Sequence, residues 1–196
     1  IPVHVTLMLS LCFGLSLFTP KAIASEVLWT QYCQHLGKMK LLVHLDTDPT
    51  AAVDGKPETV KLWLRKDAAD DWNRAGSQPV DRLTATALFA LEGWPRHTKK
   101  LFKVTCNNSE WEGTFRAEPK AGSILKLAAL SCHKDIAWPW KDAIAELISH
   151  DPDLVYFSGD QIYENDYGSP MFRAMTKAEV PKGMKNYLHK WSKFGE

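Results

Sequence analysis

The stretch PDLVYFSGDQIYEND, residues 152–166, runs from an apolar strand pattern directly into acidic, amide and phenol side chains. Leu154 to Phe157 form the short apolar run that is typical of a buried strand. Gly159 follows the run, and a residue without a Cβ allows a sharp bend that aims Asp160 inward. We predict that the strand holds Asp160 and Tyr163 at a reactive site.

A second apolar run, ILKLAAL at residues 124–130, lies upstream of the first. Its nearly continuous apolar character predicts a strand buried on both faces. Between the two runs, Ile144, Leu147 and Ile148 recur at helical spacing. Asp151-Pro152 ends that helix, since the residue before a proline is pushed out of the α region. Strand, helix and strand at this spacing predict one βαβ unit with parallel strands.

Parallel strands bring their carboxyl ends to the same edge of a sheet, where ligands bind. Cys132 lies just beyond the first predicted strand and Asp160 just beyond the second, and Tyr163 reaches the same point if residues 161–163 turn back. A thiolate, a carboxylate and a phenolate together are costly unless a cation neutralises them. This donor set favours a strongly Lewis-acidic, redox-capable transition metal such as ferric iron over magnesium or calcium alone. We predict a metal site of Cys132, Asp160 and Tyr163, with Asp160 also catalytic.

Each of these residues also has a purely structural alternative. Cys132 could be a small buried apolar side chain, Asp160 could cap a turn, and Tyr163 could belong to the core. Their grouping at one sheet edge favours the functional interpretation. His133 neighbours Cys132 and could touch substrate or leaving group, and His150 suits the C-terminal end of a helix dipole. Neither is assigned as a ligand.

From Lys40 to Pro119 the chain shows short strand-like runs with no strong helical period between them. The runs are LLVHLDT, VKLWLR, LTATALFALEG, KLFKVTC and WEGTFRAEP, and turn-rich stretches such as DPTAAVDGKPE and RAGSQP separate them. The pattern predicts an antiparallel β-sandwich of the immunoglobulin or fibronectin type over residues 25–119. Its predicted apolar anchors are Trp63, Trp94 and Trp111.

Residues 1–24 have the pattern of a secretory signal peptide, with an uncharged apolar run and the small-x-small triplet Ala22-Ile23-Ala24. A membrane anchor is the alternative, but the run is shorter than the roughly 20 residues that a bilayer needs. We therefore expect an exported protein, periplasmic or extracellular, with no stable membrane span. Export permits disulfides, so Cys33 and Cys106 could pair and leave Cys132 free.

Composition sets further bounds. The chain has 196 residues, 45% of them apolar, and a net charge of +1, values typical of a globular protein long enough for one domain and part of another. Near-neutral charge gives no electrostatic reason to expect a nucleic-acid partner. The tail is predicted to be helical from Gly183 or Met184, with an apolar stripe of Tyr187, Leu188 and Trp191 and with its lysines in solvent.

Three segments together resemble the PhoD-like metallophosphatases, the alkaline phosphatase D family. They are Ser131-Cys132 after a strand, PDLVYFSGDQIYEND at 152–166 and NYLHKWSKFG at 186–195. GDQIYE is the distinctive part, and Ser131-Cys132 stands where ordinary calcineurin-like metallophosphatases carry Asp-x-His. The resemblance covers most of the chain after residue 24 loosely, including a β-sandwich ahead of the catalytic domain, and residues 124–195 specifically.

The resemblance implies an exported hydrolase of phosphoric monoesters or diesters that uses iron and calcium. It implies that Cys132 binds Fe³⁺, that Asp160 bridges iron and calcium, and that Tyr163 is a further iron ligand. It also implies that residues 120–196 begin the α/β metallophosphatase-type domain. In that family an Asp-Asp-His stretch and more ligands follow the YLHKW-like helix, and this sequence stops at Glu196 before them. We therefore expect a C-terminally incomplete fragment with little or no activity of its own.

Two other functions compete with this one. The first is a Cys-dependent hydrolase, with Cys132 as nucleophile and His133 or His150 as base, which would lose activity on thiol alkylation and be indifferent to chelators. The second is a secreted binding module, in which the sandwich recognises a surface polymer and the βαβ segment is a degenerate catalytic remnant.

Overall fold

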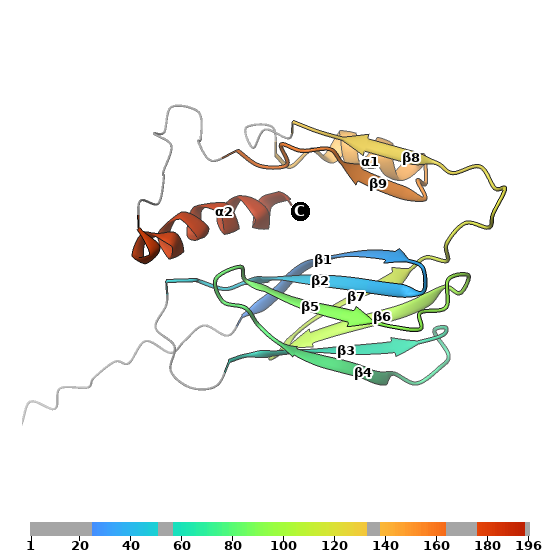
Figure 1. Cartoon of the computed structure of the whole chain (residues 1–196), viewed down its shortest axis with the longest axis horizontal. Coiled ribbons are helices and arrows are strands. Elements are labelled where there is room, and N and C mark those ends of the chain that lie inside the picture. Colours follow the sequence, from blue (N-terminus) through green and yellow to red (C-terminus); the bar gives the residue numbers. More distant parts are fainter. Residues whose placement is uncertain (1–24, 51–56, 133–137, 164–175, 195–196) are drawn as a thin grey trace, which may run out of the picture.

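The computed structural model describes residues 25–50, 57–132, 138–163 and 176–194, so the predictions for residues 1–24 and for His133 lie outside the described residues. The described chain is mostly β-sheet with few helices, as the strand patterns predict. Figure 1 shows two antiparallel sheets, a separate pair of strands beside helix α1, and helix α2 lying along the first sheet. The sequence places the candidate site on the separate pair.

The first sheet has three antiparallel strands in the order β1-β2-β5. Its strands are β1 (Glu26–His35), β2 (Lys38–Asp46) and β5 (Thr86–Leu91). Every second side chain of β2 from Met39 to Leu45 is buried, which is the period of a strand with one face in a core. Leu36 and Gly37, both at positive φ, make the tight turn between β1 and β2.

The second sheet has four antiparallel strands in the order β4-β3-β6-β7. Its strands are β3 (Thr59–Arg65), β4 (Asn73–Pro79), β6 (Lys100–Cys106) and β7 (Ser109–Phe115). Buried side chains of both sheets belong to a single hydrophobic cluster, so the two sheets share one core. Phe102 and Phe115 stack within it, with ring centroids 4.3 Å apart.

Strand β4 corrects one sequence prediction. RAGSQP was expected to separate strands, but residues 73–79 form a strand that pairs with β3. Most side chains of β4 are exposed, and the strand lies at the edge of its sheet with Pro79 as its last residue. Backbone pairing rather than an apolar pattern therefore holds it, which is why periodicity missed it.

Two predictions about the core of these sheets are also wrong. Trp94 is in the core, but Trp63 is only half-buried and Trp111, on edge strand β7, is exposed. Trp63 follows the buried Leu62, and neighbouring residues of a strand point to opposite faces.

The sequence left open whether Cys33 pairs with Cys106, and in the structure both cysteines are free. Cys106 is buried inside the shared core, whereas Cys33 is exposed on β1. The two thiols therefore lie in different environments.

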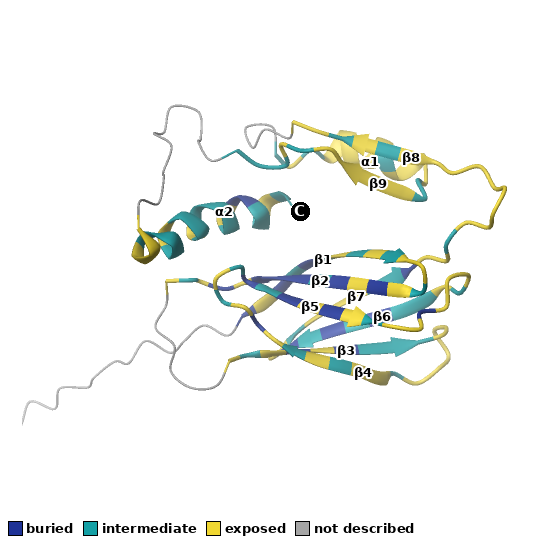
Figure 2. Ribbon diagram, in the orientation of Figure 1, coloured by how far each residue is buried: buried dark blue, intermediate teal, exposed yellow. Residues whose placement is uncertain are grey.

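The remaining strands, β8 (Leu127–Leu130) and β9 (Leu154–Phe157), pair in parallel, and helix α1 (Lys141–Ser149) lies between them in the chain. The prediction that the first of these strands is buried on both faces is wrong. Leu127 is 56% exposed, every residue of β9 is exposed, and α1 contains no buried residue (Figure 2). Among the described residues, too few pack against β8 and β9 to bury these apolar strands.

Helix α2 runs from Val180 to Phe194 and follows the short 3₁₀ helix η2 (Lys177–Glu179). It begins earlier than the predicted Gly183 or Met184, because the side chains of Thr176 and Glu179 form a capping box ahead of it. Its predicted apolar stripe is half-buried.

Aromatic contacts join α2 to both parts of the chain. Trp29 of β1 donates its Nε1 hydrogen to the carbonyl oxygen of Trp191 at 3.2 Å, and the two rings are 5.7 Å apart. Phe194 lies 6.0 Å from the ring of Trp29 and 5.5 Å from the ring of Phe157. The last turn of α2 therefore bridges the first sheet and strand β9.

A second link connects the end of β7 to the loop before β9. Arg116 donates to Asp151 at 2.6 Å and lies 3.7 Å from Asp153. These two aspartates therefore occupy the turn at the edge opposite the candidate site, which is where the sequence assigned them. None of the helices within the described ranges is both long and apolar enough to cross a membrane.

Candidate metal centre

The carboxyl ends of β8 and β9 leave their sheet side by side. The register pairs Leu130 with Phe157, so Ser131-Cys132 and Ser158-Gly159-Asp160 continue from neighbouring positions. The backbone N–H of Ser158 donates to the Leu130 carbonyl at 2.9 Å, and Ser131 Oγ donates to the Gly159 carbonyl at 3.3 Å. These bonds fix the two chain ends against each other.

The three predicted site residues converge on one carboxylate oxygen. Cys132 Sγ donates to Asp160 Oδ2 at 3.7 Å, and Tyr163 Oη donates to the same oxygen at 3.2 Å. Cys132 and Asp160 are 28 residues apart, so the parallel pairing brings them together. The sequence predicted this juxtaposition from strand order alone.

Both strand ends adopt unusual backbone conformations at the site. Cys132 has φ 59° and Asp160 has φ 55°, and side chains other than glycine rarely occupy this left-handed region. Gly159 has φ 130°, and a Cβ built there meets no atom within 4 Å, so conformation rather than space requires the glycine. Backbone strain of this kind clusters at ligand sites, where surrounding bonds hold it in place.

The electrostatics of the site follow from this crowding. The hydrogen bond to Cys132, together with burial and the nearby Asp160 carboxylate, raises the pKa of Tyr163 to about 12. Tyr163 is therefore a neutral phenol near pH 7, and it shares the carboxylate oxygen with a thiol. The thiol and the phenol both donate to the same carboxylate oxygen. A bound cation would favour loss of these protons, and the three side chains could then act as its ligands.

Helix α2 supplies a residue that sequence reasoning missed. The prediction that its lysines lie in solvent is wrong for Lys190, which is 2% exposed and donates its ammonium hydrogen to the carbonyl oxygen of Tyr163. Helical spacing contained a signal, because Lys190 is three residues after Tyr187 and four before Phe194 and so shares the apolar face. Ser131, to which the sequence analysis assigned no role, donates a hydrogen bond to the backbone carbonyl of Gly159.

His150 does not lie at the candidate centre. His150 follows α1 and its Nε2 is 3.0 Å from Glu146. Its carbonyl accepts a hydrogen bond from Lys126, the residue before β8, so His150 stands at the amino edge of the pair.

The donor set suits ferric iron. Sulfur, carboxylate and phenol oxygens lie within contact of one another, and hard oxygen ligands combined with a thiolate suit a strongly Lewis-acidic transition metal. Calcium prefers oxygen ligands, and of the three residues Asp160 supplies the carboxylate it would take. Within the described ranges, no group of three or more His, Cys, Asp and Glu side chains is placed to hold a metal. The centre proposed here has two residues of these types, and its third is a tyrosine.

Comparison with known proteins adds evidence on the fold. No family model and no curated protein matches the sequence. The solved structure of PhoD matches with a TM-score of 0.59 and 16% identity, covering 85% of this chain and 36% of that chain. A hypothetical protein from Pyrococcus horikoshii OT3 matches with a TM-score of 0.31 and 12% identity, covering 52% of this chain and 91% of that one. An oxidised superoxide reductase matches with a TM-score of 0.31 and 13% identity, covering 48% and 90%.

The likeness to PhoD concerns the fold alone, because the identity is low. The class that it defines is a β-rich chain whose fold is similar to part of the PhoD structure. The particular structure it resembles is PhoD, and this chain spans about a third of that protein's length. The two weaker matches have TM-scores too low to carry an argument.

Proposed function

We propose that the protein is an exported, metal-dependent hydrolase of phosphoric monoesters or diesters of the PhoD type, and that this chain carries the first part of its metal site. The observation that supports the proposal is the convergence of Cys132, Asp160 and Tyr163 on one oxygen at the carboxyl edge of β8 and β9. The fold shared with PhoD over 85% of the chain supports it independently.

The domain organisation is part of this proposal. Residues 25–119 would form a β-sandwich of the immunoglobulin or fibronectin type, supported by the common core of the two antiparallel sheets. Residues 120–196 would begin an α/β metallophosphatase-type domain with a βαβ unit, supported by the parallel pairing of β8 and β9 around α1. Residues 1–24 would direct export to the periplasm or beyond the cell, supported by their apolar run and small-x-small triplet.

In the proposed mechanism, Cys132 and Tyr163 would hold iron and Asp160 would contact both iron and calcium. The metals, when bound, would act as Lewis acids on the phosphate ester and make an oxygen nucleophile available at neutral pH. Cys132 and Tyr163 would give up the protons that they now donate to Asp160. Lys190 would keep Tyr163 in place through its backbone carbonyl, and Ser131 would hold the turn at Gly159.

Catalysis by a Cys132 nucleophile is the less favoured alternative. It needs a base beside the thiol, and His150 stands at the opposite edge of the strand pair with Glu146. Among the residues that the structure describes, which do not include the other candidate base His133, the groups in contact with the thiol are a carboxylate, a serine hydroxyl and, through the shared oxygen, a phenol. This environment suits metal coordination better than acyl or phosphoryl transfer to sulfur.

The proposal is tested by reading the coding sequence past Glu196 and assaying the complete product with nitrophenyl phosphate and bis(nitrophenyl) phosphate. We expect an open frame that includes an Asp-Asp-His segment, hydrolysis that EDTA abolishes, and restoration by iron and calcium. Asp160→Asn should lower kcat on the order of 100-fold, while Asp142→Asn, in the exposed first turn of α1, should not. Activity that survives EDTA and disappears on thiol alkylation would instead support the cysteine hydrolase.

A further inference from the structure

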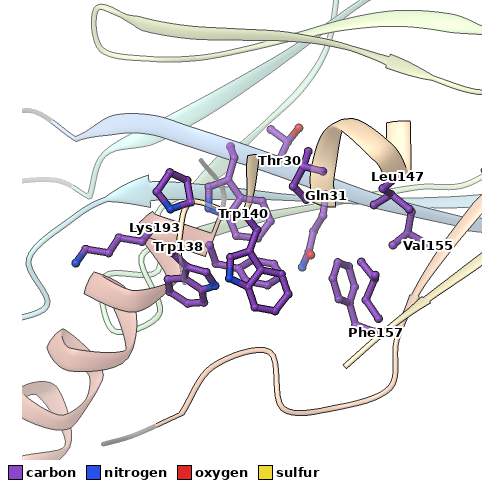
Figure 3. Close-up of a pocket in the computed structure, with 13 residues that line it drawn as sticks. Thr30, Gln31, Trp138, Trp140, Leu147, Val155, Phe157 and Lys193 are labelled. Atoms are coloured by element: carbon purple, nitrogen blue, oxygen red, sulfur yellow. The ribbon is translucent and has the colours of Figure 1, made fainter. Parts of the chain in front are cut away.

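A cavity of about 360 Å³ lies where five elements meet (Figure 3). Strand β1, helix α1, the strands β8 and β9, and the last turn of α2 all contribute to its lining. Volumes of this size are typical of small-molecule sites. The cavity is built from both parts of the chain.

Aromatic rings dominate the walls of this cavity. Trp29 comes from β1, Trp138 and Trp140 precede α1, Phe157 ends β9, and Phe194 ends α2. Figure 3 shows the two indole rings of Trp138 and Trp140 next to each other, with Phe157 beyond them. Rings of this kind hold flat or alkyl groups by area burial and by offset or edge contacts.

The polar part of the lining offers no counter-ion to a cationic ligand. Among the described residues that line the cavity there is no acidic side chain, and the charged one is Lys193, which is exposed. Thr30 and Gln31 add neutral hydrogen-bonding groups from β1. An ammonium ligand would meet the Lys193 charge without a counter-ion, so the lining fits a neutral apolar group beside an anionic one.

The cavity adjoins the candidate metal centre through the backbone. Leu130 and Phe157 line it as the last residues of β8 and β9. Cys132 follows Leu130 by two residues and Asp160 follows Phe157 by three. Two or three residues of chain span at most about 7 to 10 Å, so a phosphate at the metal centre and a ring in the cavity fit within one small molecule.

We propose that this cavity binds the apolar alcohol portion of a phosphate ester, of about the size of a naphthyl ring. The proposal rests on the proposed phosphatase function for the phosphate end of that molecule. Binding in the cavity can be tested separately, because a neutral aromatic alcohol should bind there without metal or phosphate.

Substitutions on the two faces of β9 give a matched test. Val155 lines the cavity, whereas the neighbouring Leu154 is absent from its lining and is exposed on the same strand. We expect Val155→Phe to fill the cavity and weaken the binding of a fluoronaphthol at least about tenfold, a change of about 1.4 kcal/mol. Leu154→Phe adds the same ring outside and should bind like the unchanged protein.

A second pair of variants protects the test against misfolding. Leu147 of α1 lines the cavity, and Ile148 beside it is exposed outside it. Leu147→Phe should weaken binding and Ile148→Phe should not. Fluorine NMR of the fluoronaphthol with EDTA present measures each dissociation constant, and circular dichroism confirms that each variant is folded.

The outcomes separate the two proposals. Failure of the unchanged protein to bind fluoronaphthol, or equal affinity in all four variants, would overturn the cavity assignment. In the complete enzyme, Val155→Phe should raise KM for naphthyl phosphate and leave KM for methyl phosphate unchanged, and equal effects on both esters would also count against it. Cavity-dependent binding without hydrolysis of any ester would contradict the phosphatase function alone.

Discussion

At the scale of single residues, Lys190 ties helix α2 to the candidate metal centre. Its ammonium group is buried and donates to the backbone carbonyl of Tyr163, whose phenol in turn donates to Asp160. A buried carbonyl that loses its donor costs about 1–3 kcal/mol, so this bond holds the turn that presents Tyr163. Lys190 is therefore a positioning residue rather than a ligand.

Replacing this lysine should loosen the site more than the fold. Lys190→Met keeps the length and apolar stem of the side chain but removes the donor, so amides 160–163 should exchange with solvent at least about tenfold faster. Lys193→Met, at an exposed position of the same helix, is the control. Hydrogen exchange followed by mass spectrometry measures both, and equal rates in the two variants would show that Lys190 does not hold Tyr163.

The juxtaposition of Cys132 and Asp160 was predictable, and the contact that Lys190 makes with Tyr163 was not. Asp160 and Cys132 follow apolar runs, and the rule that parallel strands share a carboxyl edge was enough to place them together. Lys190 approaches the site from an element with no sequence-local relation to β9. Helical periodicity places Lys190 on the apolar face of α2, but a lysine is normally solvated, so its burial was not predicted.

At the scale of elements, the contact between β2 and α2 contains a titratable group that must stay neutral. His44 is 8% exposed, stacks on Trp29 with ring centroids 3.9 Å apart, and lies 5.8 Å from the ring of Trp191. Its Nε2 has no hydrogen-bond partner within the described residues. Burial among these rings lowers the pKa of His44 to about 4.

This lowered pKa predicts acid sensitivity. The unfolded chain binds a proton at His44 below about pH 6.5, and the folded chain does so only below about pH 4. The free energy of unfolding therefore contains the full contribution of neutral His44 above pH 6.5 and loses it as the pH falls toward 4. The loss amounts to about 3 kcal/mol. His44→Phe keeps the ring stack and should flatten this part of the pH profile.

Urea unfolding between pH 4 and pH 8 measures the effect. His35→Phe, at the exposed end of β1, is the control and should keep the slope of the unchanged protein. Parallel profiles for His44→Phe and the unchanged protein would show that His44 is not the group responsible.

Element boundaries also show where sequence reasoning stops. Strand β4 has no apolar alternation because it is an exposed edge, so only its backbone pairing with β3 reveals it. The apolar runs of β8 and β9 predicted strands correctly. Whether an apolar strand is buried depends on the elements that pack against it, and the sequence of the strand does not show these. The early start of α2 depends on the capping box at Thr176.

At the scale of the whole molecule, the described chain has one well-buried core and one exposed unit. The two antiparallel sheets share a cluster that includes fully buried Leu41, Val60 and Val104, whereas β8, α1 and β9 contain no buried residue. Aromatic contacts of α2 and the Arg116 ion pairs connect them. An exposed ion pair contributes at most about 1 kcal/mol, so the Arg116 pairs add little to this connection compared with the burial in the core.

Local stability should follow this division. Backbone amides of β2, β3 and β6 should open only with global unfolding, and amides of β8 and β9 should open at a free energy lower by at least about 2 kcal/mol. Native-state hydrogen exchange resolved by NMR measures the two groups in one experiment. Equal protection of β8 and the core strands would show that the exposed unit is as stable as the sheets.

The central claim is that Cys132, Asp160 and Tyr163 form the first part of a metal site, and titration of this chain with a soluble ferric complex tests it most directly. Ferric iron bound by a phenolate and a thiolate gives a visible charge-transfer band, and we expect one band that saturates with a single iron. Tyr163→Phe, Cys132→Ser and Asp160→Asn should each remove or shift the band. Tyr156→Phe and Cys33→Ser, at exposed positions of β9 and β1, should leave it unchanged. Absence of the band, or the same band in Tyr163→Phe as in Tyr156→Phe, would contradict the account.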